Sequence, residues 1–186
     1  IDAASCKWVL VVDADELVTP ELKEYLYSLI EKENAPQGLY VPRKSRFMGR
    51  FMHCFYPDYQ LRFFIRKDTV WPAVIHADPI IKGRIEKILA THADMALVHL
   101  ADDSIASRMG KINQYTANEI EKKKDRNYGM AALFYRPLVR FFRAYIQKGG
   151  FRDGKEGFVC ACYEGIYQFV AVSKIIEDRL KHKKGK

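Results

Sequence analysis

The sequence predicts an α/β fold, and its first 38 residues give the clearest indication. Residues 7–13 read K-W-V-L-V-V-D, a continuous apolar run with β-branched residues, typical of a central strand covered on both faces. After an acidic segment, Thr19 and Pro20 begin a helix, because Thr is a favoured N-cap and Pro fits the first helical position. The apolar stripe of this helix is Leu22, Leu26, Leu29 and Ile30. The Ala-Pro-Gln-Gly turn at residues 35–38 ends it, which completes a unit of α/β character.

Residues 39–99 are predicted to form mainly strands, separated by loops that contain Gly and Pro. The expected strands are residues 39–41, 60–66, 74–76 and 95–99. After the last of them, Asp102 or Asp103 is expected to cap a further helix. The apolar stripe of that helix is Ile105, Met109, Ile112 and Thr116.

Composition excludes several classes of protein. The chain has 186 residues, 48% hydrophobic and 29% charged, so it is long enough for a real core and is not disordered or collagenous. Its four cysteines lack the spacing of a disulfide framework, and we interpret them as reduced thiols in a cytosolic context. No run of about 18 uncharged apolar residues is present, so no ordinary membrane span is expected.

Positive charge is concentrated in the second part of the chain. Residues 1–100 carry 13 Lys and Arg against 13 Asp and Glu, whereas residues 101–186 carry 18 against 10. The whole net charge of +8 therefore lies after residue 100. Nucleic acid, anionic lipid and phosphorylated substrates all fit this asymmetry.

A basic and aromatic helix is predicted within residues 136–146. Its two sides are formed by Arg136, Arg140 and Arg143, and largely by Leu138, Phe141, Phe142 and Tyr145. This pattern fits a helix in a membrane interface, and it fits equally a surface helix packed on its own core. Residues 158–176 are apolar but contain Glu164, so a packed or half-immersed helix is expected there instead of a membrane span.

The acidic segment after the first strand is the clearest candidate for chemistry. Asp13 and Asp15 stand at the end of that strand, where open α/β sheets bind ligands. Carboxylate oxygens suit Mg²⁺ or Mn²⁺, which commonly complete their coordination with substrate phosphates. An Asp-x-Asp also occurs by chance in acidic loops, but the preceding apolar strand and the following capped helix favour function.

Several motifs together resemble a known family. The segment W-V-L-V-V-D-A-D-E-L at residues 8–17, followed by T-P-E-L at 19–22, is similar to the metal-binding segment of family 2 glycosyltransferases. F-M-G-R at 47–50, Y-P-D-Y-Q-L-R-F-F at 56–64, V-I-H-A-D at 74–78 and L-V-H at 97–99 resemble blocks of one subgroup. That subgroup is typified by lipopolysaccharide core β-1,4-glucosyltransferases, and residues 149–158 also resemble its C-terminal end.

The resemblance implies a GT-A-like mixed sheet that lacks its N-terminal part, followed by a helical tail. Residues 1–103 would form the catalytic half, and residues 104–186 a basic, membrane-associating region. The chain begins about where the metal loop begins, so the strands that grip the nucleotide base are expected to be missing. We therefore expect this fragment alone to bind the donor poorly.

Roles for individual residues follow from the same resemblance. Asp15 and His99 are expected to hold Mn²⁺ or Mg²⁺, and Asp13 to contact either the ion or the ribose of the donor; His99 also fits a structural histidine at a strand end. Asp78 stands where the subgroup has Glu, and it is the candidate base that takes the acceptor hydroxyl's proton during inverting transfer. The expected donor or acceptor contacts are Gly49, Asp58, Gln60, Arg62 and His76. Gln60 and Arg62 share one strand face, which alternatively is only a solvated edge.

The predicted function is transfer of a hexose, with glucose the first expectation, from a nucleotide diphosphate sugar such as a UDP-sugar. The acceptor would be a lipopolysaccharide core or another lipid-linked saccharide. The enzyme would be cytoplasmic and peripheral, bound to the inner face of a bacterial plasma membrane through the basic helix. Nucleic acid is not an expected partner. The alternatives are a basic nucleic-acid-binding module and a catalytically silent GT-A scaffold.

Overall fold

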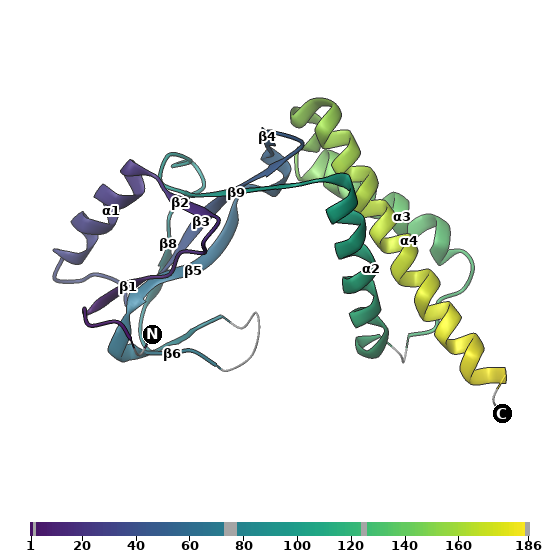
Figure 1. The fold of residues 1–186 in the computed structure, drawn as a ribbon, viewed down its shortest axis with the longest axis horizontal. Coiled ribbons are helices and arrows are strands. Elements are labelled where there is room, and N and C mark those ends of the chain that lie inside the picture. The colour runs from purple at the N-terminus through teal and green to yellow at the C-terminus, as the bar shows by residue number, and fades with distance from the viewer. Residues whose placement is uncertain (2, 73–77, 124–125, 185–186) are drawn as a thin grey trace. The chain divides into compact units, whose positions relative to one another are not determined.

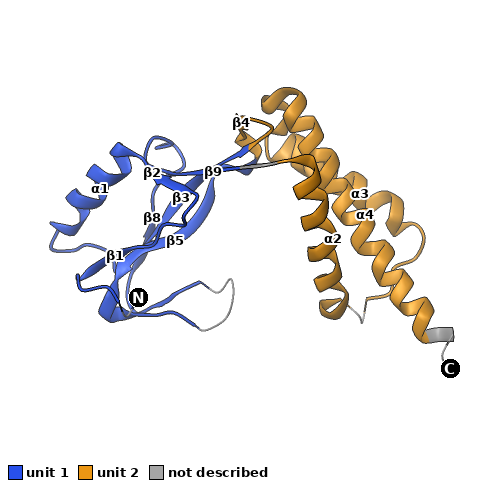
Figure 2. Ribbon diagram, viewed as in Figure 1, with its two compact units in different colours: residues 1–46, 55–101 blue, residues 47–54, 102–186 orange. Residues whose placement is uncertain are grey.

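The computed structural model describes residues 1, 3–72, 78–123 and 126–184. The chain divides into two compact units, shown in Figure 2. The first contains residues 1–46 and 55–101 and holds the sheet; the second contains residues 47–54 and 102–186 and is mainly helical. The predicted α/β class is confirmed at this level.

The described residues form a mixed sheet of seven strands, most of which lie in the first unit (Figure 1). The main path runs in the order β1 (Trp8–Leu10), β5 (Asp58–Ile65), β3 (Gly38–Phe47), β9 (Leu97–Asp103) and β2 (Glu16–Val18). The strands β4 (Arg50–Phe51) and β8 (Ile85–Lys87) also pair with β3, and β8 does so in parallel. The strands β6 (Thr69–Val70) and β7 (Ile80–Ile81) form a separate ribbon. Short 3₁₀ turns η1 (His53–Phe55) and η2 (Arg66–Asp68) flank β5.

Helix α1 (Pro20–Ile30) provides the apolar core of this unit. Thr19 caps it as predicted, accepting a hydrogen bond from the backbone N–H of Leu22, and Pro20 occupies the first turn. The Thr19 hydroxyl also donates to the carbonyl of Asp94 at 2.6 Å, which ties the start of the helix to the chain before β9. The core residues are Leu22, Leu26, Leu29, Leu39, Val41, Phe63, Ile88 and Leu97.

Three expectations about the elements were wrong. The first strand is not central: β1 covers only residues 8–10, pairs with β5 at one end of the sheet path, and is half-buried. The short strand β2 lies between the acidic loop and α1, because residues 16–18 pair with β9. Ser104, and not Asp102 or Asp103, caps α2 (Ile105–Lys122), because β9 continues to residue 103. The strand expected at residues 74–76 lies outside the described residues.

The helical unit contains three main helices. They are α2, α3 (Ala132–Phe142), which continues into the π-helical turn η3 (Arg143–Gln147), and α4 (Gly154–Lys184), which follows the 3₁₀ turn η4 (Gly150–Asp153). In α2 the predicted stripe is only half right, since Ile112 and Thr116 are buried but Ile105 and Met109 are exposed. The hydroxyl of Tyr167 on α4 donates to Glu119 of α2 at 2.7 Å, and burial with this hydrogen bond raises the pKa of Tyr167 to about 12.

The pairing of Glu164 explains how α4 accommodates a carboxylate within an apolar segment. Arg140 of α3 donates to Glu164 at 2.9 Å, and the ring of Phe141 packs edge-on against Phe158. Within the described residues, Gly150–His182 is one helical stretch long and apolar enough to cross a membrane, with a mean hydropathy of 1.3 over its best window. A third of that window is buried inside the protein.

The junction of η4 and α4 requires glycine at position 157. A Cβ atom there would lie 1.9 Å from the carbonyl oxygen of Gly150 and 2.7 Å from Cβ of Asp153. We therefore expect Gly157→Ala to destabilise the protein by about 1–3 kcal/mol, the usual cost of overpacking. Chemical denaturation measures the effect. Gly110→Ala in α2 is the matched control, because nothing lies within 4 Å of its added methyl group. Equal stability of the two variants would contradict this account.

Candidate functional site

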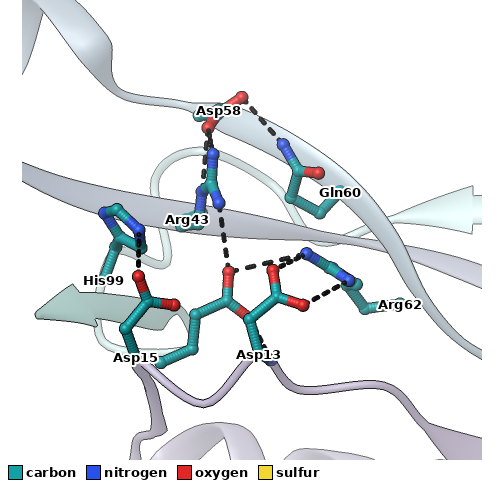
Figure 3. A network of polar contacts seen from close by, with 8 residues as sticks. Asp13, Asp15, Arg43, Asp58, Gln60, Arg62 and His99 are labelled. Carbon is teal, nitrogen blue, oxygen red and sulfur yellow. Dashed lines mark hydrogen bonds and ion pairs between the residues drawn. The ribbon is translucent and has the colours of Figure 1, made fainter. Parts of the chain in front are cut away.

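The acidic loop is organised around the carboxylate of Glu16, the first residue of β2. Its side chain is fully buried. One oxygen accepts a hydrogen bond from Arg43 at 3.2 Å and lies 3.7 Å from a guanidinium nitrogen of Arg62. The other oxygen accepts from the backbone N–H of Asp13 at 3.1 Å, which fixes the turn of the loop. Figure 3 shows the two guanidinium groups reaching this network from neighbouring strands.

Arg43 extends the network from Glu16 to Asp58, which lies opposite it in the register of β3 and β5. Two nitrogens of Arg43 donate to one oxygen of Asp58, at 2.7 and 2.9 Å (Figure 3). Gln60 donates to the other oxygen at 3.0 Å. Burial alone would lower the pKa of Arg43, but the hydrogen bonds and charges of Asp58 and Glu16 raise it above its ordinary value. Arg43 is therefore a fixed cation within the sheet.

Asp13 is paired with Arg62 of β5, whose guanidinium donates to both carboxylate oxygens (Figure 3). About half of the Asp13 side chain is exposed, whereas that of Arg62 is largely buried. Among the described residues, Arg62 Nε is buried without a hydrogen-bond partner. The two terminal nitrogens of Arg62 therefore donate to Asp13, while its Nε makes no hydrogen bond within the described part of the chain.

Asp15 and His99 form a second pair, with Nε2 of His99 3.1 Å from Oδ2 of Asp15 (Figure 3). The sheet aligns them, because Glu16 is opposite His99 in the register of β2 and β9, and the Leu100 N–H donates to the Asp15 carbonyl at 2.7 Å. A carboxylate and an imidazole side by side fit a divalent cation that draws its other ligands from phosphates and water. The described residues contain no group of three or more His, Cys, Asp or Glu arranged to hold a metal.

A pocket of about 400 Å³ opens beside Asp13 and brings four of the predicted site residues together. Its lining is Asp13, Gln60, Leu61, Arg62, Trp71, Asp78 and Pro79. The side chain of Asp78 is exposed, and Trp71 is 38% exposed while its ring contacts Phe64. The pocket thus combines two carboxylates, one guanidinium, one amide and one indole ring.

Other predicted site residues are placed apart from this pocket. Asp58 does not line it and is held by Arg43 and Gln60. Gly49 belongs to the segment 47–54 of the helical unit, with a φ of +81° in the turn between β3 and β4. His76 lies outside the described residues.

The predicted membrane-contact residues divide into two groups. Arg140 pairs with Glu164, and Arg136 donates to Gln168 at 3.3 Å, so both of these arginines contact α4. Phe141 packs in a cluster with Tyr145 and Phe158. Phe142 and Arg143 are exposed. The exposed apolar side chains of α3 and η3 are Phe134, Tyr135, Leu138, Val139, Phe142 and Ile146.

Sequence reasoning missed three residues of the site: Glu16, Arg43 and Trp71. Arg43 gave no distinct signal, because it is the first of three cations within residues 43–46. Glu16 gave no local signal, because its burial depends on partners that are 27 and 46 positions further along the chain. Trp71 lies next to a proline in a loop, where sequence periodicity is uninformative.

Comparisons with known proteins do not assign this chain to a family. No family model matches it. No solved structure matches it significantly.

The role of Glu16 can be tested by an isosteric change. We expect Glu16→Gln to lower the free energy of unfolding by about 3 kcal/mol, because it leaves two buried guanidinium groups without their shared anion. Urea denaturation measures this effect. Glu86→Gln is the control, since Glu86 makes an exposed ion pair with Arg84 at 3.2 Å and should change stability by less than about 1 kcal/mol. Similar losses in both variants would argue against a central role for Glu16.

Proposed function

We propose that the sheet unit carries out metal-dependent, inverting transfer of a hexose from a nucleotide diphosphate sugar to a saccharide acceptor. The proposal rests mainly on the pocket that gathers Asp13, Arg62 and Asp78 next to the pair formed by Asp15 and His99. This arrangement offers ligands for a cation, a donor for phosphate oxygens and a separate carboxylate for proton transfer. The motif resemblance supports the same reaction.

The negative charge of the donor would be held from two sides. Asp15 and His99 would hold Mn²⁺ or Mg²⁺, and such an ion, when bound, would stabilise the charge of the departing diphosphate. Arg62 would donate to a phosphate oxygen, since a guanidinium suits the geometry of phosphate. Because Arg62 is also paired with Asp13, donor binding would rearrange this contact.

Asp78 would act as the general base. Its carboxylate would accept the proton of the acceptor hydroxyl as that oxygen attacks the anomeric carbon and the bond to the diphosphate breaks. Its exposed position in the lining of the pocket suits a group that meets an incoming acceptor. The ring of Trp71 would pack against an apolar face of a sugar, a role typical of aromatic side chains in ligand pockets.

The helical unit would bind an anionic membrane surface, which would bring the enzyme to a lipid-linked acceptor. The exposed apolar side chains of α3 and η3 would enter the interface, and the excess of Lys and Arg after residue 100 would attract anionic headgroups. Such an enzyme would be peripheral, on the cytoplasmic face of a bacterial plasma membrane. Lipopolysaccharide core is the acceptor that the motif resemblance favours.

The cation site makes a prediction that does not depend on turnover. We expect Mn²⁺, titrated with UDP into the longest natural form of the protein and followed by the electron paramagnetic resonance signal of free Mn²⁺, to bind at least about tenfold more weakly to Asp15→Asn and His99→Gln. Asp94→Asn, an exposed aspartate away from this pair, should bind like the unmodified chain. Unchanged binding in both site variants would overturn the assignment.

The proposed role of Asp78 predicts a loss of sugar transfer without a loss of donor binding. We expect Asp78→Asn to reduce sugar transfer by about 10²–10⁴-fold, since it removes a general base, while UDP affinity with Mn²⁺ stays unchanged. Transfer would be followed as UDP release with UDP-glucose and lipopolysaccharide core, using the longest natural form of the protein. Full activity of this variant would exclude Asp78 as the base.

Membrane association can be measured with vesicles. We expect the chain to sediment with vesicles containing phosphatidylglycerol, and replacement of both Leu138 and Phe142 by Ser to weaken this binding about tenfold or more. Val70→Ser is the control, because Val70 is equally exposed but belongs to the sheet unit. Salt-dependent binding to oligonucleotides without vesicle binding would instead favour the nucleic-acid alternative.

A further inference from the structure

Two cysteines that are distant in sequence meet in the interior of the helical unit. Cys54, in η1, and Cys160, in α4, are 106 positions apart, yet their sulfur atoms are 4.0 Å from each other. Both residues are buried, with 7% and 1% of their surface exposed. Cys6 is exposed and Cys162 is half-exposed, so the two buried thiols form a distinct pair.

The surroundings make the two thiols unequal. The thiol of Cys54 donates to the sulfur of Cys160, and a guanidinium nitrogen of Arg108 lies 3.6 Å from the same sulfur. The hydrogen bond from Cys54, followed by the charge of Arg108, lowers the pKa of Cys160 in spite of burial. The same hydrogen bond, together with burial, raises the pKa of Cys54. Cys160 is thus the more acidic thiol of the pair, and Cys54 the hydrogen-bond donor to it.

Asp153 holds Cys54 in place beside α4. Its buried carboxylate accepts hydrogen bonds from the backbone N–H groups of His53 and Cys54, at 2.8 and 3.0 Å. Burial opposes its charge, but these backbone hydrogen bonds keep the pKa of Asp153 below its ordinary value. The position of Cys54 is therefore set by the fold and does not depend on its own sulfur contact.

We propose that Cys54 and Cys160 form a redox-active pair that hydrogen peroxide converts to an intramolecular disulfide. The Cys160 thiolate attacks one peroxide oxygen, the O–O bond breaks, and the leaving hydroxide takes up a proton to become water. The sulfur of Cys54 then attacks Cys160–SOH, the S–O bond breaks, and the departing oxygen leaves as water with the Cys54 proton. Two thiols lose two electrons in total, and one peroxide becomes two molecules of water.

Three features of the pair favour this chemistry over inert burial. A thiolate stabilised by a cation is the nucleophile in thiol oxidation, and Arg108 supplies that cation. The sulfur of Cys54 lies 4.0 Å from that of Cys160 and can attack the sulfenic acid, which favours the disulfide over further oxidation. Burial excludes bulky reagents, so a small neutral oxidant is the reagent that the site would select. The disulfide would link the segment 47–54 covalently to α4.

Peptide mapping of the whole chain tests the proposal directly. The protein is treated with a small excess of hydrogen peroxide, its free thiols are blocked with N-ethylmaleimide in denaturant, and tryptic peptides are analysed by mass spectrometry. We expect a cross-linked peptide pair joining Cys54 to Cys160, lost after dithiothreitol, in a protein whose chains are not linked to one another by disulfides. The oxidised protein should melt about 5 °C or more above the reduced one, because the bond closes a long loop. Oxidation at Cys6 or Cys162 with Cys54 and Cys160 still reduced would overturn it.

Serine variants assign the order of the two steps. Cys54→Ser should stop at the sulfenic acid of Cys160, which dimedone traps when it is added together with a denaturant, whereas Cys160→Ser should leave Cys54 at least about tenfold slower to oxidise. Cys6→Ser and Cys162→Ser are matched controls and should form the disulfide at the normal rate. Dimedone labelling of Cys54 in the Cys160→Ser variant at the wild-type rate would refute the assigned nucleophile. The peptide map of the unmodified chain remains decisive should a variant fold poorly.

Discussion

The acidic loop depends on one interaction, the burial of the Glu16 carboxylate between guanidinium groups from β3 and β5. A buried carboxylate is stable only when opposite charge and hydrogen bonds replace its hydration, and Arg43, Arg62 and a backbone N–H of the loop provide them. This one charge therefore fixes the loop to two strands that are remote from it in sequence. The positions of Asp13 and Asp15, which flank the turn, follow from that attachment.

The network also divides the two aspartates between different partners. Asp13 faces Arg62, while Asp15 faces His99. A cation bound at Asp15 and His99 would have two neighbouring ligands and would leave the ion pairs of Glu16 intact. A cation bound at Asp13 would have to compete with the guanidinium of Arg62. In the proposed reaction, the arrival of an anionic donor would weaken that competition, because phosphate oxygens offer Arg62 an alternative acceptor. Occupation of the site by donor and cation would then be mutually favourable.

Local signals in the sequence predicted part of the fold and part of the site. Helix α1 was predicted closely because Thr19 and Pro20 define its start through contacts within one turn. The strand β2 was missed because three residues form a strand there only through pairing with β9. Asp13, Gln60, Arg62 and Asp78 were selected from motifs, and they line one pocket. Glu16, Arg43 and the Cys54–Cys160 pair were not found, since each depends on contacts with a partner at least 15 positions away.

The segment 47–54 has a consequence for any attempt to divide the chain. It leaves the sheet unit after residue 46, joins the helical unit, and returns at residue 55, so the polypeptide crosses between the units there as well as at residue 101. Within the helical unit, Phe47 is fully buried, with its ring against Tyr163 and under the guanidinium of Arg108. A truncation after residue 101 would remove the residues that bury Phe47 and would expose an apolar, aggregation-prone surface. An isolated sheet domain therefore requires a short hairpin turn in place of residues 47–54, in addition to the cut.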